Sequence, residues 1–250
     1  MSKNSTVKDD REPHYRGSFL METKEDMAAM FRQIHGSYDV LNHLFSFGND
    51  VRWRRKSAAL LRFRKADRIL DFGAGTGDFA TAVRRSANVQ VAALDLVPEM
   101  MKRLLQKRDG NDLSWVTLIV GDGERLPFAD ETFDGVVAGF VGRNLFSLKG
   151  GLREMSRVLK TGGRVGFLEF CRPTNPVIKA VTWLYFRTIV SLLGNLFAPK
   201  DLPAYSYLIH SIEEFLGPDE LAQIFREVGF RKVRTKMFNL ETVALTMGEK

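Results

Sequence analysis

The sequence predicts an α/β protein built on a doubly wound, mostly parallel sheet. Apolar runs of strand length alternate with helical patterns along much of the chain, which is typical of parallel sheets covered by helices. One run, residues 68–72, leads directly into a turn with glycine at every second position from 73 to 77. Several runs also end at or just before an acidic residue. Ligand-binding groups are therefore expected at the carboxyl edge of the sheet.

The composition is that of an ordinary globular protein of one domain. Hydrophobic residues make up 44% and charged residues 27% of the 250 residues. A single cysteine and four scattered histidines provide neither a disulfide framework nor metal-ligand spacing, so no metal is expected. The net charge of +7 favours anionic partners such as acidic lipid headgroups or nucleic acid. The first 25 residues contain no apolar run typical of a secretory signal, which predicts a cytoplasmic protein.

The N-terminal part divides into an arm and a helical cap. Residues 1–25 are polar and unpatterned, which predicts a flexible arm. Residues 26–62 are expected to form the cap, because apolar side chains recur at i, i+3, i+4 and i+7 from Met27. Tyr38, Asp39 and Asn42 then place three polar groups within one helical turn. They either brace the helix or face a ligand.

The stretch from Asp71 to Asp78 is the strongest sign of a binding site. It predicts a buried strand, a tight glycine turn and the start of a helix. The dinucleotide fingerprint G-x-G-x-x-G needs glycine at position 78, where this chain has an acid that disfavours a pyrophosphate. A cationic ligand without phosphate, such as S-adenosylmethionine, suits the turn better. The alternative is a structural turn with no ligand.

Two further acids follow predicted strands. The strand 89–94 ends at Asp95, about 20 residues past the glycines, where such folds hold a ribose diol. The alternative role for Asp95 is to cap the helix expected over 98–108. The strand 116–120 leads to Asp122, which is placed to accept from an adenine amino group or serves only as a turn acid.

The remaining pattern completes the sheet. A strand over 133–140 runs into Gly142-Arg143-Asn144, and a helix over 148–159 is expected to end at a glycine cap, Gly162-Gly163. A strand follows over 164–170. A helix over 219–227 and an antiparallel hairpin of 232–237 with 242–247 end the chain.

Residues 176–198 form the least polar segment. The segment is nearly long enough to span a bilayer, but it contains Lys179 and Arg187. An apolar lid insertion over 174–215 fits better, either over the binding cleft or on a membrane surface. The second form predicts peripheral association with the inner face of the cell membrane. The alternative is an ordinary core helix or the interface of a homodimer.

Four stretches together resemble a known family. They are Tyr38–Asn42 with Trp53-Arg54, Asp71–Asp78, Gly142–Asn144, and Leu168–Pro173. The second stretch is similar to class I S-adenosylmethionine-dependent methyltransferases, which have a Rossmann-like fold. All four resemble the ubiquinone/menaquinone biosynthesis C-methyltransferase family in order, and 204–212 is a weaker match. Phe140-Val141-Gly142, Thr161 and His35-Gly36-Ser37 depart from the family pattern, which leaves the identity of the quinone open.

The resemblance implies a methyl transfer from S-adenosylmethionine to a ring carbon of a polyprenylated, demethylated quinol. Arg143 would favour the phenolate form of the ring, and Asn144 and Tyr38 would orient its hydroxyl or a water. Asp39 would hold Arg143 or Tyr38. The residues expected to bind the cofactor are Asp71, Gly73, Gly75, Thr76, Gly77, Asp95, Leu96, Asp122 and Gly123.

Two other functions remain open at this point. Another small-molecule or lipid methyltransferase would keep the cofactor residues without needing the Arg143-Asn144 pair. A nucleic-acid methyltransferase or basic binding module is indicated only by the charge. Amino-methylating DNA enzymes carry an Asp/Asn-Pro-Pro-aromatic run where this chain has residues 140–144, and the basic residues are scattered rather than interleaved with aromatics. No nucleic-acid partner is expected.

Overall fold

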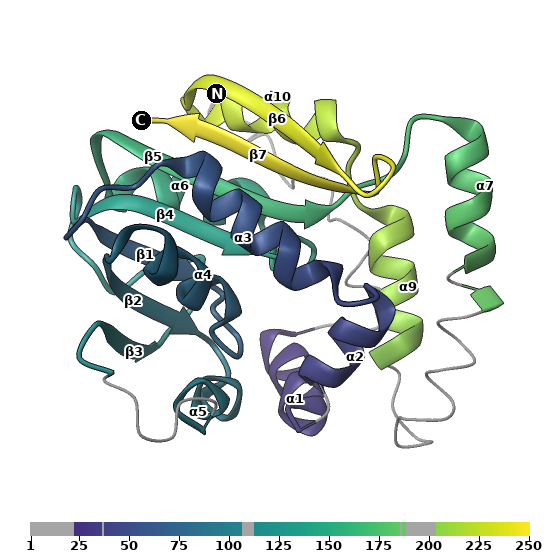
Figure 1. Cartoon of the computed structure of the whole chain (residues 1–250), viewed down its shortest axis with the longest axis horizontal. Helices are drawn as coiled ribbons and strands as arrows, with labels where there is room; N and C mark the ends of the chain where they lie inside the picture. Colours follow the sequence, from purple (N-terminus) through teal and green to yellow (C-terminus); the bar gives the residue numbers. More distant parts are fainter. Residues whose placement is uncertain (1–22, 37, 107–112, 186, 189–203) are drawn as a thin grey trace, which may run out of the picture.

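The chain folds around one seven-stranded sheet of order β3-β2-β1-β4-β5-β7-β6 (Figure 1). The computed structural model describes residues 23–36, 38–106, 113–185, 187–188 and 204–250. The strands are β1 (Arg68–Phe72), β2 (Gln90–Asp95), β3 (Val116–Val120), β4 (Phe133–Gly139), β5 (Leu159–Phe170), β6 (Arg231–Phe238) and β7 (Val243–Glu249). β1 to β5 pair in parallel, and β7 pairs antiparallel with both β5 and β6. The predicted doubly wound sheet and its closing hairpin are confirmed.

Helices cover both faces of the sheet and its carboxyl edge. Their bounds are α1 (Lys24–Ile34), α2 (Tyr38–Phe45), α3 (Asn49–Leu61), α4 (Asp78–Ala87), α5 (Pro98–Gln106), α6 (Leu148–Val158), α7 (Pro176–Tyr185), α9 (Ala204–Glu214) and α10 (Pro218–Val228). In Figure 1, α3 and α4 lie in front of the sheet and α6 and α10 behind it. α1, α2 and α9 gather where the parallel strands end, and α7 stands to their right.

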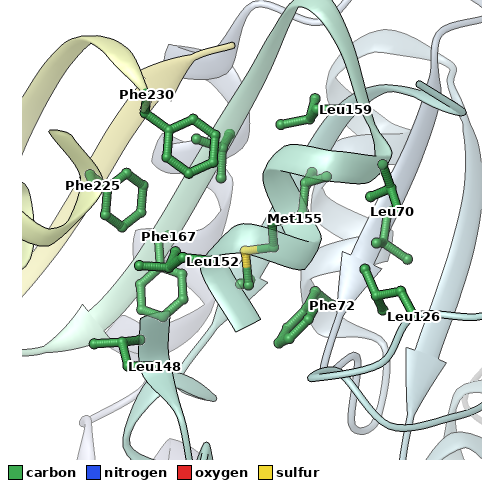
Figure 2. Close-up of a cluster of buried hydrophobic side chains, with 14 of the residues drawn as sticks. Leu70, Phe72, Leu126, Leu148, Leu152, Met155, Leu159, Phe167, Phe225 and Phe230 are labelled. Atoms are coloured by element: carbon green, nitrogen blue, oxygen red, sulfur yellow. The ribbon is translucent and has the colours of Figure 1, made fainter. Parts of the chain in front are cut away.

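The core has two parts because a parallel sheet is covered on both faces. On one face, side chains of β4 and β5 pack against α6 and α10, with Leu152, Met155 and Phe225 completely buried (Figure 2). On the other face, α3 packs against β5, and α4 packs against β2 and β4. The parallel strands therefore carry nearly continuous apolar runs, which is why the sequence predicted most of them closely.

The predicted glycine cap at Gly162-Gly163 was wrong. α6 ends at Val158, and Leu159 already adopts extended angles of φ −71° and ψ 137°. Leu159 pairs with Phe133 of β4, so β5 begins five residues before the predicted strand at Arg164. Gly162 has a positive φ of +77°, but it lies within β5 and not at the end of a helix. Pairing with a neighbouring strand outweighed the local glycine signal.

The N-terminal cap consists of three helices. α1 begins at Lys24, two residues before the predicted boundary, because Thr23 and Asp26 form a reciprocal capping box. Gly48, with φ +70°, precedes α3. Residues 1–22 of the predicted arm and residues 189–203 of the predicted lid lie outside the described residues. Among the helices that the structure describes, none has the length and apolar character needed to cross a bilayer.

We expect Leu152→Ala to lower the free energy of unfolding by about 2–5 kcal/mol. The Leu152 side chain points from α6 into the core and is completely buried, so its removal leaves a cavity. Leu60→Ala is the matched control, since Leu60 lies on a helix but is 43% exposed. Urea denaturation of both variants measures the difference. Equal losses would contradict the placement of α6 against the sheet.

Candidate active site

The glycine turn, residues 73–77, connects β1 to α4 at the carboxyl edge of the sheet. All three glycines have positive φ, +66° for Gly73, +54° for Gly75 and +78° for Gly77. A Cβ on Gly73 would lie 2.4 Å from Val141 Cγ2, and one on Gly77 would lie 2.4 Å from Leu104 Cδ1. A Cβ on Gly75 meets nothing closer than 3.8 Å. Gly73 and Gly77 are therefore required by packing, whereas Gly75 leaves space toward a pocket.

That pocket, here called the cofactor pocket, encloses about 790 Å³ of empty space beside the glycine turn. Its walls come from the ends of β1 to β4, from α1 and from Tyr38 of α2. The predicted cofactor residues among its lining are Gly73, Gly75, Asp95, Leu96, Asp122 and Gly123. A smaller hollow on the other side of the turn is lined by Asp71, Thr76 and Arg54, and it shares Tyr38, Gly73 and Gly75 with the cofactor pocket.

Asp71 is buried under the start of α4. Its Oδ2 accepts from the backbone N–H of Ala80 at 2.8 Å, which satisfies one of the free donors of that helix. Burial raises the pKa of Asp71 to about 7, and the nearby charge of Arg54 opposes this rise only partly. A cationic group in the adjoining hollow would stabilise the ionised form.

Asp122 makes the turn contact that its alternative role predicted, whereas Asp95 accepts from backbone N–H groups outside α5 and does not cap that helix. Asp95 accepts from the N–H groups of Gly75 at 2.7 Å and Val97 at 2.9 Å, and its burial raises its pKa. Asp122 accepts from the N–H of Glu124 at 2.9 Å. Each carboxylate oxygen retains a second lone pair, so both acids can still accept from a ligand. The structural and ligand-binding roles are compatible.

Asp39 of α2 is tied to the glycine turn. It is buried and accepts a hydrogen bond from Oγ1 of Thr76. This contact fixes α2, and with it the neighbouring Tyr38, against the turn. Burial raises the pKa of Tyr38, so its hydroxyl remains protonated at neutral pH and can donate.

Arg143 is turned inward, into a buried ion pair. Its Nη1 lies 3.1 Å from Oε1 of Glu169, and its guanidinium lies 5.4 Å from the ring centre of Phe170. Oε2 of Glu169 accepts from the N–H of Gly142 at 2.8 Å. Burial raises the pKa of Glu169, and the charge of Arg143 acts against this rise. Nε of Arg143 is buried without a hydrogen-bond partner among the residues that the structure describes.

Asn144 lies at the pocket wall next to Arg143. The hydroxyl of Tyr207, on α9, donates to Oδ1 of Asn144 at 2.9 Å. The amide NH₂ is therefore the group that Asn144 can offer to a ligand. Arg143 itself is not among the residues that line the cofactor pocket.

Four residues of this region were not predicted to take part in the site. Glu169, Tyr207, Arg54 and Lys24 received no role, although Glu169 is an acid within an apolar strand and Arg54 stands four residues after Asp50, its partner at 2.9 Å. A charged residue inside an apolar strand and an acid–arginine pair at i, i+4 are both signals that indicate a buried ion pair. The contacts of Tyr207 and Lys24 join distant parts of the chain and had no local signal.

The sequence matches the ubiE/COQ5 methyltransferase family over residues 20–250. The chain belongs to this family. Demethylmenaquinone methyltransferase of Halalkalibacterium halodurans is 37% identical over 234 residues, which cover 92% of this chain and 95% of that protein. Ubiquinone/menaquinone biosynthesis C-methyltransferase UbiE of a Geobacter species is 38% identical over 218 residues, covering 86% and 92%.

Solved structures agree on the fold. A methyltransferase of Thermotoga maritima that depends on S-adenosylmethionine superimposes with a TM-score of 0.63 at 16% identity, over 90% of this chain and 99% of that one. The chain is thus an enzyme of the ubiE/COQ5 family with a Rossmann-like fold and uses S-adenosylmethionine as methyl donor. The pocket fits this cofactor, since it joins an apolar lining with acids for a ribose and an amine and with open space over Gly75.

We expect cofactor affinity to rise with pH up to about 7, because Asp71 must be ionised to attract a cationic group and its pKa lies near 7. Below that value the affinity should fall by up to about tenfold per pH unit. The same shift means that the protein without cofactor loses stability as pH rises from 3.8 towards 7. Calorimetry in buffers of different ionisation enthalpy measures proton release on binding.

Asp71→Asn should remove both the slope and the proton release. Asp130→Asn is the control, because the Asp130 side chain is 73% exposed and does not line the pocket. A slope that persists in Asp71→Asn would assign the titration to another group.

Proposed function

We propose that the enzyme methylates a ring carbon of a demethylated, polyprenylated quinol. The observation that carries this proposal is the position of Asn144, held by Tyr207 at the wall of the cofactor pocket. The names of the relatives from Halalkalibacterium and Geobacter support a menaquinol or ubiquinol precursor as substrate. Both ring types stay candidates, since the same polar groups serve either.

Two side chains at the pocket wall are placed to orient the ring. Tyr38 and Asn144 both line the cofactor pocket, so a flat ring between them would lie next to the cofactor. The Asn144 amide donates to a ring oxygen, and the Tyr38 hydroxyl donates to the same oxygen or to a water. The bound cofactor supplies an activated methyl group. Correct placement of the acceptor carbon accounts for much of the expected acceleration.

Arg143 acts on the ring from behind this wall. A phenol has a pKa of about 10, so only about a thousandth is ionised at neutral pH, and a nearby guanidinium lowers such a pKa by roughly 1–3 units. Because Glu169 partly neutralises Arg143, we infer an effect at the lower end of that range. Nε of Arg143, which has no hydrogen-bond partner among the described residues, is one donor available to a substrate oxygen or a bridging water.

α7 is the part of the molecule best suited to a membrane surface. None of its residues is buried, and Val177, Val181 and Leu184 are 69%, 60% and 55% exposed at a spacing of i, i+4, i+7. Its other side borders a hollow of about 810 Å³, opposite Ile212 of α9. We propose that α7 rests on the inner face of the cell membrane, where the substrate dissolves. A homodimer contact through the same stripe is the competing use.

We expect the enzyme to transfer labelled methyl groups to demethylmenaquinol, to the demethylated benzoquinol precursor, or to both, when each is supplied in detergent. Asn144→Ala should lower kcat by about a hundredfold or more with cofactor affinity unchanged, because one positioned donor is lost. Gln223→Ala on α10 is the control. Label in neither lipid, with cofactor shown to bind, would reject the proposed substrate class.

Replacing Val177, Val181 and Leu184 together by serine should weaken binding to vesicles with anionic lipid at least about tenfold, since three apolar side chains no longer enter the lipid. Vesicle co-sedimentation measures this change. Val51→Ser with Leu60→Ser on α3 is the control, because both side chains are also exposed. If the triple variant instead changes the sedimentation of the protein alone, the stripe is a dimer contact.

A further inference from the structure

One face of α1 forms a wall of the cofactor pocket. Lys24, Met27, Ala28 and Phe31 all line the pocket, and they follow one another at i, i+3, i+4 and i+7. The opposite wall is the loop after β3, with Asp122, Gly123 and Glu124. A nucleoside placed with its amino group at Asp122 would therefore lie between α1 and this loop.

Lys24 joins the two walls. Its Nζ donates to Oδ2 of Asp122 at 2.7 Å and lies 3.2 Å from Oε2 of Glu124. Burial by itself lowers the pKa of Lys24, but the hydrogen bonds and charges of the two acids outweigh it and leave that pKa above its usual value. The residue therefore remains charged throughout the neutral pH range.

Backbone hydrogen bonds hold both acids in place independently of Lys24. Oδ1 of Asp122 accepts from the N–H of Glu124 at 2.9 Å, and Oε1 of Glu124 accepts from the N–H of Phe146 at 2.7 Å. Both carboxylates thus belong to the rigid edge of the sheet. Lys24 reaches them from the first turn of α1 through a long side chain that is 33% exposed.

Elsewhere α1 is held mainly by apolar packing, in which Met27, Met30 and Ile34 form a buried cluster with Tyr207. Arg32 lies 3.5 Å from Glu99 of α5 with more than half of its side chain exposed. Apolar contacts hold the middle of the helix, where Ala28 packs with Val97 and Met100. Apolar contacts have no fixed direction, so they permit a helix to swing or slide. The contacts of Lys24 with Asp122 and Glu124 have a fixed geometry, and they close the end of the cofactor pocket at which the adenine would lie.

We propose that Lys24, Asp122 and Glu124 form a latch that holds α1 over the adenine end of the cofactor pocket, so that the cofactor enters and leaves only when this contact opens. The proposal rests on the cofactor position inferred above and not on the identity of the methyl acceptor. Asp122 keeps a free lone pair for the adenine amino group while Lys24 is bound. Lys24 is thus a positioning residue, acting through α1 and Asp122.

Lys24→Met tests the latch, because methionine keeps the length of the side chain and removes its charge. Stopped-flow fluorescence with S-adenosylmethionine measures the association and dissociation rate constants. In 50 mM salt we expect dissociation to accelerate about two- to fivefold and association to accelerate as well, since both directions require α1 to open. Wild-type dissociation should quicken as the salt concentration rises, and that of Lys24→Met should not.

Two further variants make the result specific. Lys24→Arg keeps the charge and should restore slow dissociation and its salt dependence. Lys56→Met removes an exposed charge from α3 and should leave both rates unchanged. Faster dissociation with unchanged association would show that Lys24 only strengthens the closed complex, and it would overturn the latch. Unchanged rates in Lys24→Met, with the variant folded by its thermal melting, would overturn it too.

Discussion

The structure depends on one constraint: four parallel strands each bring a carboxylate to the same edge of a sheet that is buried on both faces. Asp71, Asp95, Asp122 and Glu169 stand at or just beyond the ends of β1, β2, β3 and β5. Asp71 and Glu169 are almost completely buried, and a buried carboxylate is costly unless it accepts hydrogen bonds. Each of the four accepts from a backbone N–H of a neighbouring loop or helix start. These bonds determine where the loops of the active site lie.

The acids also divide the cleft into regions with different chemistry. Asp71 has a raised pKa and lies with Arg54 beside the small hollow, whereas Asp95 and Asp122 line the larger pocket. Glu169 does not line the larger pocket but determines the orientation of Arg143. A cofactor carrying positive charge near a sulfur and an amine at its far end matches this distribution. The acceptor ring then has only the side of Tyr38 and Asn144 left to approach.

α1 and α9 connect these regions to one another. Met27, Met30 and Ile34 of α1 form a buried cluster with Tyr207 of α9. Met27 also lines the cofactor pocket, and Tyr207 holds Asn144. The same packing therefore adjoins both the cofactor and the residue proposed to orient the acceptor. α1 and Asn144 are thus joined through one packed cluster.

Local patterns were sufficient for the sheet, for most helices and for part of the lining of the cofactor pocket, whose α1 wall was not predicted. The apolar runs predicted every strand to within a few residues except β5, where pairing with Phe133 extended the strand through Leu159 despite two glycines. The Asp71–Asp78 stretch located the turn, because positive φ at alternate positions strongly favours glycine. The roles of Asp39 and Arg143 were only partly foreseen, since Asp39 binds Thr76 and Arg143 pairs with Glu169.

The sequence by itself determined the fold, the turn and the family, because each is written in neighbouring residues as periodicity, spacing and motif. Only the tertiary structure decided which partner each charged group has. Lys24 and Asp122 are 98 positions apart, and Tyr207 and Asn144 are 63 apart. Such contacts depend on where whole helices pack, and helix packing is set by the summed apolar surface rather than by any single residue. The cover of the pocket and the support of Asn144 arise from that packing.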